Sequence, residues 1–370
     1  MTNIKIGKIR GIEIYLDFSW FFIFILLSWT LATYYFPRHY PHWPKETNWI
    51  MGILASLLLF ASVLLHELAH SIVAQKQGEE VKRITLFILG GVAQITKEPE
   101  TPIAEFKMAI AGPLMSLALG ISFWGLKIIL YNINKPLMAL SSYLSFINLL
   151  LAGFNLLPGY PMDGGRILRA IIWKWTGNLK KATHIASKTG QGMAIFFIFF
   201  GLLQIFGGFW LNGLWMILIG FFLYQASLKS YQQIMIKEFL KNIKAKNLMT
   251  QDFIIVHPET PLRTLVDEYI LKRGQRAFFV GDDEIMGIVC LEDIKRISSK
   301  EWAQVKVKEI MTPRSLLQTV SPEDDAMTVL QRLTTHNIHQ IPVMENNHLI
   351  GVITRNDLLR WIQVRSEWGE

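Results

Sequence analysis

Two histidines and a glutamate lie close together in one apolar stretch, in the pattern His66-Glu67-Leu-Ala-His70. On a helix, residues four positions apart lie on the same face, so both histidines could bind one metal ion. Neutral imidazoles at this spacing suit Zn²⁺, which keeps a coordination position open when three protein groups bind it. Glu67 lies beside that face, where its carboxylate could take a proton from a metal-activated water. The pattern predicts a zinc site with hydrolytic chemistry; a polar cluster that only joins helices is the alternative.

A third metal ligand has to come from another segment, and the chain offers one in Asn155–Arg166, with the sequence NLLPGYPMDGGR. The two prolines prevent a regular helix, and the two glycines after Asp163 are expected to loosen the backbone there. Irregular backbone at membrane depth is tolerated only where protein buries it or where it lines a cavity. We therefore expect the Asp163 carboxylate to join His66 and His70, with an ordinary turn aspartate as the alternative.

The elements that must position these residues belong to an apolar part of the chain. Apolar residues make up 51% of the 370 residues. Residues 1–240 contain 20 Lys and Arg against 11 Asp and Glu, whereas residues 241–370 contain 17 against 18. The basic excess thus belongs to the apolar part, where Lys and Arg that flank membrane spans explain it. A nucleic-acid-binding domain would carry its own basic patch, so we expect no binding to nucleic acid.

The chain contains one cysteine, Cys290, which excludes an intramolecular disulfide and a cysteine-based metal cluster. We expect this side chain to be a small buried apolar group. The apolar run near the N-terminus is too long for the core of a signal peptide and lacks a clear small-residue cleavage site, so no cleaved signal peptide is expected.

A helix that crosses a membrane needs about 20 mostly apolar residues. Six segments meet this requirement, at roughly residues 14–35, 50–75, 104–130, 137–157, 189–208 and 210–228. The last two are joined by Gly207, Gly208 and a short aromatic stretch, which predicts a hairpin. The predicted fold of this part is a multi-pass α-helical membrane domain.

Lys and Arg in the short connections indicate which ends of the spans face the cytosol. With the N-terminus in the cytosol, the outer connections hold only Arg38, Lys45 and Lys135. The cytosolic connections then hold Lys5, Lys8, Arg10, Lys76, Lys82, Arg83, Lys97, Arg166, Arg169, Lys174, Lys180, Lys181 and Lys188. An even number of spans leaves the C-terminal part on the same side. We therefore predict a multi-pass protein of the cell membrane with a cytosolic N-terminus and tail.

The two motifs together closely resemble those of the site-2 protease family of intramembrane zinc metalloproteases, a peptidase family M50-like group, over about residues 1–230. The resemblance implies His66, His70 and Asp163 as ligands of one Zn²⁺, with Glu67 as the general base. It also implies a membrane-anchored protein substrate, such as a transcription factor or an anti-sigma factor. Such a substrate would be cut within or near the lipid bilayer in regulated intramembrane proteolysis.

Further positions match the family. Asn155, eight residues before Asp163, resembles the family's asparagine that approaches the metal and steadies the substrate carbonyl, with an interhelical hydrogen bond as the alternative. Gly90 and Gly91 are similar to a re-entrant strand that holds the unwound substrate by edge-strand pairing, with a plain hairpin turn as the alternative. Ala111-Gly112-Pro113 in the third span also fits the family, and we expect these residues to pack.

From about residue 244 the chain repeats itself. Lys246–Thr250 recurs as Lys308–Thr312, and Ile285–Asp293 recurs as Leu349–Asp357, with offsets of 62 to 64 residues. Each copy alternates short β-branched runs with helical segments. This pattern predicts two α+β units packed against one another.

The repeat looks like a tandem pair of cystathionine-β-synthase-type (CBS) modules over roughly residues 244–364. In that family a Thr or Ser three residues before an Asp binds the phosphate and ribose of an adenine nucleotide, which implies ATP, ADP or AMP here. Thr354 and Asp357 keep the pattern, whereas Cys290 replaces the hydroxyl residue before Asp293. A structural pair without a ligand is the alternative, and a homo-oligomer formed through the CBS modules stays open.

The predicted domains are a transmembrane zinc metalloprotease domain, a linker and two CBS repeats, at residues 1–230, 231–243, 244–304 and 305–370. The predicted function is an intramembrane zinc metalloendopeptidase whose activity is modulated by nucleotide binding to the cytosolic CBS pair. A CBS-gated membrane transporter or channel, with the intramembrane polar residues lining an ion path, is the alternative. An inactive scaffold that keeps the fold is a third hypothesis.

Overall fold

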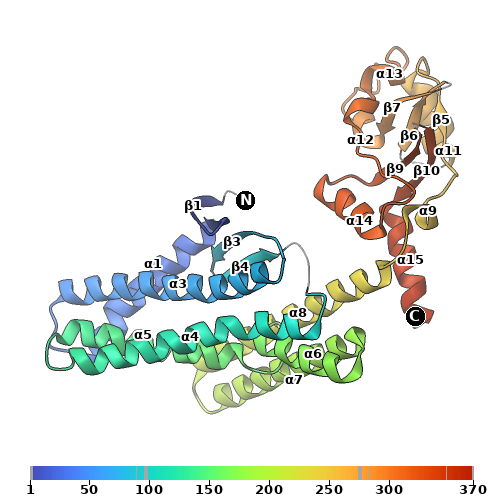
Figure 1. Cartoon of the computed structure of the whole chain (residues 1–370). Helices are drawn as coiled ribbons and strands as arrows, with labels where there is room; N and C mark the ends of the chain where they lie inside the picture. The colour runs from blue at the N-terminus through green and yellow to red at the C-terminus, as the bar shows by residue number, and fades with distance from the viewer. Residues whose placement is uncertain are drawn as a thin grey trace. The chain divides into compact units, whose positions relative to one another are not determined.

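The computed structural model describes residues 3–88, 90–95, 99–273, 277–282, 284–346 and 348–368. These residues form two compact units, and the boundary between them falls between Ile234 and Met235. The first unit is built mainly of long helices, and the second contains short strands and short helices (Figure 1). The prediction of a helical membrane domain followed by an α+β domain is therefore confirmed.

In the described part of the chain, six helices are long and apolar enough to cross a membrane. The first is α1 (Phe18–Thr30) continued by the π-helix η1 (Leu31–Tyr35) and α2 (Phe36–His39). The others are α3 (Lys45–Lys76), α4 (Pro102–Leu130), α5 (Lys135–Asn155), α7 (Leu179–Phe206) and α8 (Trp210–Leu240). The shorter α6 (Asp163–Thr176) lies between α5 and α7 in the chain.

Two of these helices, α7 and α8, extend far beyond the predicted spans. Helix α7 begins at Leu179 because Asn178 caps it, its side chain accepting a hydrogen bond from the Lys181 backbone at 2.9 Å. The sequence did not predict this start, because the lysines in the first turns of α7 interrupt the apolar run. Helix α8 runs to Leu240, so the residues expected to link the domains begin as helix. After Gly220 no Gly or Pro occurs before Asn242, which has a positive φ of 62° and suits a helix end.

A four-stranded sheet lies against α3, with two strands from the segment before α1 and two from the segment after α3. Its strands are β1 (Ile4–Ile9), β2 (Ile12–Leu16), β3 (Val81–Phe87) and β4 (Gly90–Ile95), in the order β1-β2-β3-β4. The two hairpins join where β2 runs parallel to β3, and β4 is at an edge. Buried Ile12 and Ile84 of the sheet pack with Leu68 of α3 and Met108 of α4. The sequence predicted only the strand near Gly90.

Helix α4 packs against α3, α5 and α6, and Figure 1 shows it beside α3 and α5. Small residues on α4 allow this close approach. A Cβ on Gly120 would lie 2.8 Å from the side chain of Leu149 in α5, and buried Ser145 of α5 donates a hydrogen bond to the Gly120 carbonyl at 2.8 Å. Such small-residue contacts are typical of helices packed in a membrane.

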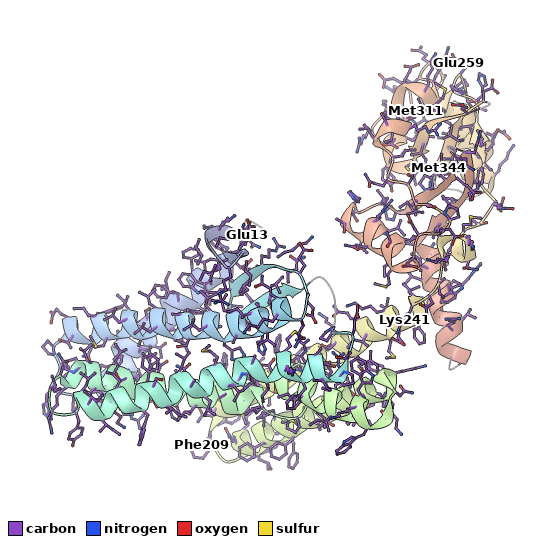
Figure 2. The ribbon with its side chains drawn as sticks, in the orientation of Figure 1. Glu13, Phe209, Lys241, Glu259, Met311 and Met344 are labelled. Atoms are coloured by element: carbon purple, nitrogen blue, oxygen red, sulfur yellow. The ribbon has the colours of Figure 1, made fainter. Side chains whose placement is uncertain are left out.

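The predicted hairpin of the last two spans is present, and Figure 2 labels Phe209 in its turn. The two helices approach closely at glycines. A Cβ on Gly201 of α7 would lie 2.7 Å from the Gly213 carbonyl, and a Cβ on Gly220 of α8 would lie 2.7 Å from the Ala194 carbonyl. Buried Ser187 and Ser227 add reciprocal hydrogen bonds to each other's carbonyls at 3.1 and 2.9 Å.

The second unit has the repeated α+β organisation. Its strands are β5 (Ile255–Val256), β6 (Ala277–Gly281), β7 (Ile285–Cys290) and β8 (Thr312–Pro313) in one sheet, and β9 (Gln340–Glu345) and β10 (His348–Thr354) in another. Its helices are α9 (Ala245–Leu248), α10 (Leu262–Thr264), η2 (Leu265–Ile270), α11 (Leu271–Arg273), α12 (Leu291–Ile294), α13 (Val307–Ile310), η3 (Arg314–Leu316), α14 (Ala326–Thr335) and α15 (Arg355–Trp368).

The two repeats exchange their leading segments. Ala245 and Leu248, from the start of the first repeat, lie in a hydrophobic core with Val329 and Ile341 of the second. Val307, from the start of the second repeat, lies in a core with Phe278 of the first. Each core is therefore built from both copies of the repeat.

Candidate metal and catalytic site

The ligand atoms of His66, His70 and Asp163 converge in the first unit. The Asp163 Oδ2 atom lies 3.1 Å from the Nε2 atom of each histidine, and the two Nε2 atoms are 3.2 Å apart. Both histidines come from one face of α3, as their spacing predicts, and both are buried. Asp163 comes from the start of α6, 93 residues beyond His70. The predicted meeting of these three side chains is thus observed.

The outer nitrogens of both rings are held by α4. His70 Nδ1 lies 2.7 Å from the Met108 carbonyl oxygen, which can only accept, so Nδ1 carries the proton and donates. His66 Nδ1 lies 2.9 Å from the hydroxyl of buried Ser116. In a neutral His70, the Nε2 atom then carries a lone pair that faces His66 and Asp163. Such hydrogen bonds to the second ring nitrogen orient metal-binding histidines in proteins.

These three residues fit a zinc ion. Zinc bonds of about 2.0–2.1 Å in a tetrahedron separate neighbouring ligand atoms by about 3.3–3.4 Å, close to the separations observed here. Gly112 of α4 leaves the room for an ion, because a Cβ there would lie 2.6 Å from His66 Nε2 and would overlap His70 Nε2 as well. Two imidazole lone pairs and a carboxylate, backed by a residue with no side chain, form a donor set typical of zinc.

Glu67 lies beside this cluster and beneath the edge strand β4. A Cβ on Gly91 would lie 2.5 Å from the Glu67 Cγ atom, so the glycine lets the strand pass over the carboxylate. Gly90 has a φ of +131° at the β3–β4 turn, which L residues rarely adopt. Gly90 thus has the turn conformation that the alternative of a plain hairpin expects. Gly91 instead packs on Glu67, the candidate base.

One expectation about the Asp163 segment is wrong. The glycines after Asp163 do not loosen the backbone, because Asp163, Gly164 and Gly165 form the first turn of α6. Their lack of side chains instead lets the helix start pack on the preceding loop. A Cβ on Gly164 would overlap the Leu156 carbonyl, and one on Gly165 would lie 2.4 Å from the Tyr160 nitrogen.

Asn155 is the last residue of α5 and is half-buried. The loop that packs on Gly164 starts at the next residue, so Asn155 leads directly into the backbone beside Asp163. Within the described part of the chain the Asn155 side chain makes no hydrogen bond, and its role stays a prediction.

The predicted nucleotide residues lie at the start of α15. Thr354 donates from its backbone nitrogen and its hydroxyl to the Asp357 carboxylate, at 3.0 and 2.7 Å. This is a capping box, a local role that needs no ligand. Asp357 also lines a cavity of about 780 Å³ together with Thr250, Arg360 and Arg365. In the first repeat, the Cys290 nitrogen donates to Asp293 at 2.9 Å in the same way.

Sequence reasoning missed the residues of α4 that complete the site. Gly112 was expected only to pack, and it packs on the Nε2 atoms of His66 and His70. Ser116 and Met108 were not singled out, nor was the buried Glu105 on the same helix face. Their spacing of three, four and four residues along α4 was a signal that they share a face. A backbone carbonyl such as that of Met108 leaves no mark in a sequence.

Comparison with known families agrees with both resemblances. The peptidase family M50 model matches residues 54–134 and 130–199, and the CBS domain model matches residues 245–300 and 307–364. The M50 matches cover residues 54–76 of α3, which include both histidines, and the segment that carries Asp163.

Similar proteins are known over nearly the whole chain. The protein sll0528 of Synechocystis sp., named a zinc metalloprotease, is 36% identical over 98% of this chain and 96% of its own length. Zinc metalloprotease MJ0392 of Methanocaldococcus jannaschii is 33% identical over 98% of this chain and 96% of its own length. The solved structure of a site-2 protease from the same organism is 34% identical, covers 62% of this chain and 94% of that chain, and gives a TM-score of 0.42.

Proposed function

The chain belongs to the site-2 protease family, peptidase family M50, whose members are zinc metalloproteases, and from this we propose that it cleaves membrane-anchored proteins within or next to the lipid bilayer. The observation that carries the proposal is the convergence of His66, His70 and Asp163 in an apolar helical unit, beside Glu67. Ionisable groups at membrane depth cost several kcal/mol or more and mark functional sites.

We assign the zinc ligands to the two α3 histidines and to Asp163. Bound zinc activates water as a nucleophile at neutral pH and polarises the carbonyl oxygen of the peptide. The chain's own residues hold the ligands ready: the Met108 carbonyl fixes the His70 tautomer, and α6 presents the carboxylate. Gly112 keeps the space between these groups open.

Glu67 serves as the proton carrier in this proposal. Its carboxylate takes one proton from the attacking water as the water oxygen bonds to the peptide carbon. It then delivers that proton to the amide nitrogen as the C–N bond breaks, so that an amine and a carboxylic acid result, and the remaining proton of the acid passes to the amine to give a carboxylate and an ammonium group. Its position one residue after His66 on α3 supports this role.

The substrate would be held in extended form along β4. The strand is at the edge of its sheet, and an exposed edge can pair with another extended chain. Gly91 brings this edge over Glu67, which would set a paired substrate backbone next to the base. Asn155 would steady the substrate carbonyl, and its place beside the Asp163 loop supports that assignment.

Adenine nucleotides are the proposed regulators. The cavity lined by Asp357 is also lined by Arg360 and Arg365, and guanidinium groups suit phosphate oxygens. Nucleotide binding would modulate proteolysis only if the ligand binds the more active and less active states with different affinity. The basic residues of the short connections support a cytosolic tail, where such nucleotides are available.

The test of the protease assignment is co-expression with candidate single-span substrates, comparing the wild-type chain with Glu67→Gln. We expect the wild type to release a shortened substrate and Glu67→Gln to leave it intact. Zinc content per chain, measured on both purified proteins, is expected to be equal, which separates loss of the base from loss of the metal. Equal cleavage by both proteins would refute the role of Glu67.

Zinc measurement on His66→Ala separates the protease from the transporter hypothesis. We expect the variant to lose zinc and cleavage together, because one of three protein ligands is removed. A polar ion path would lack a stoichiometric zinc, so wild-type protein purified without zinc would favour the transporter.

A further inference from the structure

A buried ion pair joins α4 to α6 on the side of the candidate metal site. Glu105 is 0% exposed and Arg169 is 3% exposed. The Arg169 Nε atom donates to Glu105 Oε1 at 2.6 Å, and a second guanidinium nitrogen contacts the same oxygen. Arg166 adds its Nε atom at 4.0 Å from that oxygen. Burial of both charges is costly, and an apolar pair of similar volume is often at least as stabilising.

The pair connects the two elements that supply the metal ligands and their supports. Glu105 lies three residues before Met108 on the same face of α4, and the Met108 carbonyl holds His70. Arg169 lies six residues after Asp163 on α6. Because Met108 and Ser116 of α4 hold the two histidine rings of α3, a shift of α4 relative to α6 would change the distance between the histidine nitrogens and the Asp163 carboxylate.

Arg169 also holds the loop that leads into Asp163. Its guanidinium carbon lies 5.4 Å from the centre of the Tyr160 ring, an arrangement that favours a cation over an aromatic face. The Tyr160 backbone nitrogen donates to the Ala186 carbonyl of α7 at 3.2 Å. One side chain thus fixes α6, its preceding loop and α4 together.

We propose that Glu105 and Arg169 are positioning residues that hold Asp163 in register with His66 and His70, so that the affinity of the site for zinc depends on their ion pair. This inference rests on the proposed zinc site. Partners that orient metal ligands typically change metal affinity or activity about 10–100-fold when they are removed.

The experiment uses the full-length protein in detergent and does not depend on a protease substrate. Glu105→Gln and Arg169→Gln are prepared beside Glu105→Gln/Arg169→Gln, which leaves no uncompensated charge and keeps a hydrogen-bonding pair. Zinc affinity is measured by competition with a chromophoric chelator. The visible spectrum of the Co²⁺-substituted protein reports the geometry at the metal.

The matched control is Ser145→Ala, which removes a buried hydrogen bond from α5 to the Gly120 carbonyl, 15 residues beyond Glu105 along α4. We expect it to keep the wild-type zinc affinity and Co²⁺ spectrum. The Gln variants are expected to bind zinc about 10–100-fold more weakly, with an altered Co²⁺ spectrum. Arg169→Lys, which keeps the charge but not the planar fork, is expected to restore part of the affinity.

Folded Gln variants with wild-type zinc affinity and an unchanged Co²⁺ spectrum would overturn the proposal. If a single variant fails to fold, the double variant decides by the same two measurements. Wild-type zinc binding by His66→Ala would instead refute the zinc site itself, so the two failures are distinguishable.

Discussion

Individual residues around the metal site differ in how much freedom the neighbouring helices leave them. The Met108 carbonyl can only accept a hydrogen bond, so it fixes the tautomer of His70. The Ser116 hydroxyl can donate or accept, so it leaves the tautomer of His66 open. Gly112 has no alternative residue, because even a methyl group would enter the space between the two Nε2 atoms. These constraints lead to predictions for single substitutions.

Gly112→Ala should reduce zinc affinity by at least about tenfold, since the methyl group would displace the two histidine rings proposed to bind the ion. Alanine favours a helix over glycine, so any loss cannot come from helix propensity. Zinc per chain, measured by atomic emission on the purified protein, checks this. Gly125→Ala is the control on the same helix, because nothing lies within 4 Å of a Cβ there, and full zinc in Gly112→Ala would contradict the prediction.

The thiol of Cys290 should be nearly unreactive in the folded protein. Burial, with Asp293 and Glu292 nearby, raises the pKa of Cys290 to about 12. A raised pKa keeps the thiol protonated, so at pH 8 the reactive thiolate is about a thousandfold scarcer than for an ordinary cysteine with a pKa of about 8.5.

The measurement for Cys290 is alkylation by iodoacetamide, followed by intact mass between pH 7 and pH 10. The rate should rise about tenfold per pH unit across the range, because the whole range lies below the thiol pKa. Unfolded protein should react fast and level off near pH 9. A plateau below pH 10 in the folded protein would show that the thiol ionises normally.

The sequence named His66, Glu67, His70 and Asp163 because their types and spacing carry a chemical pattern of their own. The ligand atoms of His66, His70 and Asp163 meet in the structure, and the roles of all four residues stay predictions. Ser116 and Gly112 could not be found in the same way. A serine or a glycine in a membrane helix gains meaning only from the face that it turns toward another helix, and one sequence does not reveal that pairing.

Secondary-structure elements bring the active-site groups together through close backbone approaches. Strand β4 passes over Glu67 at Gly91, and the start of α6 packs on its own preceding loop at Gly164. Long apolar helices were predictable, because the length of an apolar run is a strong signal. The sheet was not predictable, because β1 carries charged residues and because β2 pairs with β3, which follows it in the chain only after α1, α2 and α3. The prolines and glycines around Asp163 concealed α6.

Gly91→Ala should lower kcat on the order of 100-fold while zinc content stays unchanged, because small misplacements of a catalytic group can cost that much. A Cβ at this position would push on the Glu67 side chain and not on the metal ligands. Turnover of a purified single-span substrate, together with zinc analysis, checks the prediction.

Gly7→Ala is the matched control in the same sheet, since it has no positive φ and nothing lies within 4 Å of its Cβ. It should keep wild-type turnover. An unchanged kcat in Gly91→Ala would mean that the strand yields and that Glu67 keeps its position.

At the scale of the whole molecule, the repeated tail has two corresponding candidate half-sites for a nucleotide, one at Asp357 after Thr354 and one at Asp293 after Cys290. The repeat was visible in the sequence because two copies can be compared directly. The exchange of leading segments between the two cores was not, because sequence offsets show which residues correspond and not which core they enter. Each half-site nevertheless uses an aspartate in the same way, to cap the nitrogen of the residue three positions earlier.

That equivalence gives a matched pair of variants for nucleotide binding. Asp357→Ala and Asp293→Ala both remove a helix cap, which costs about 1 kcal/mol of stability in either case. Only Asp357→Ala should abolish the heat of binding of AMP, ADP or ATP in calorimetry on the full-length protein, because Asp357 lines the cavity with the arginines. No heat with any nucleotide in the wild type, or equal heat in both variants, would contradict the prediction.

The protected state of Cys290 also makes the protein convenient for spectroscopy. As the chain has no other cysteine, a new one introduced on an exposed surface would take up a maleimide dye or a spin label almost alone. Two such labels, one in each unit, would report distance changes when nucleotide is added, without first replacing the native cysteine.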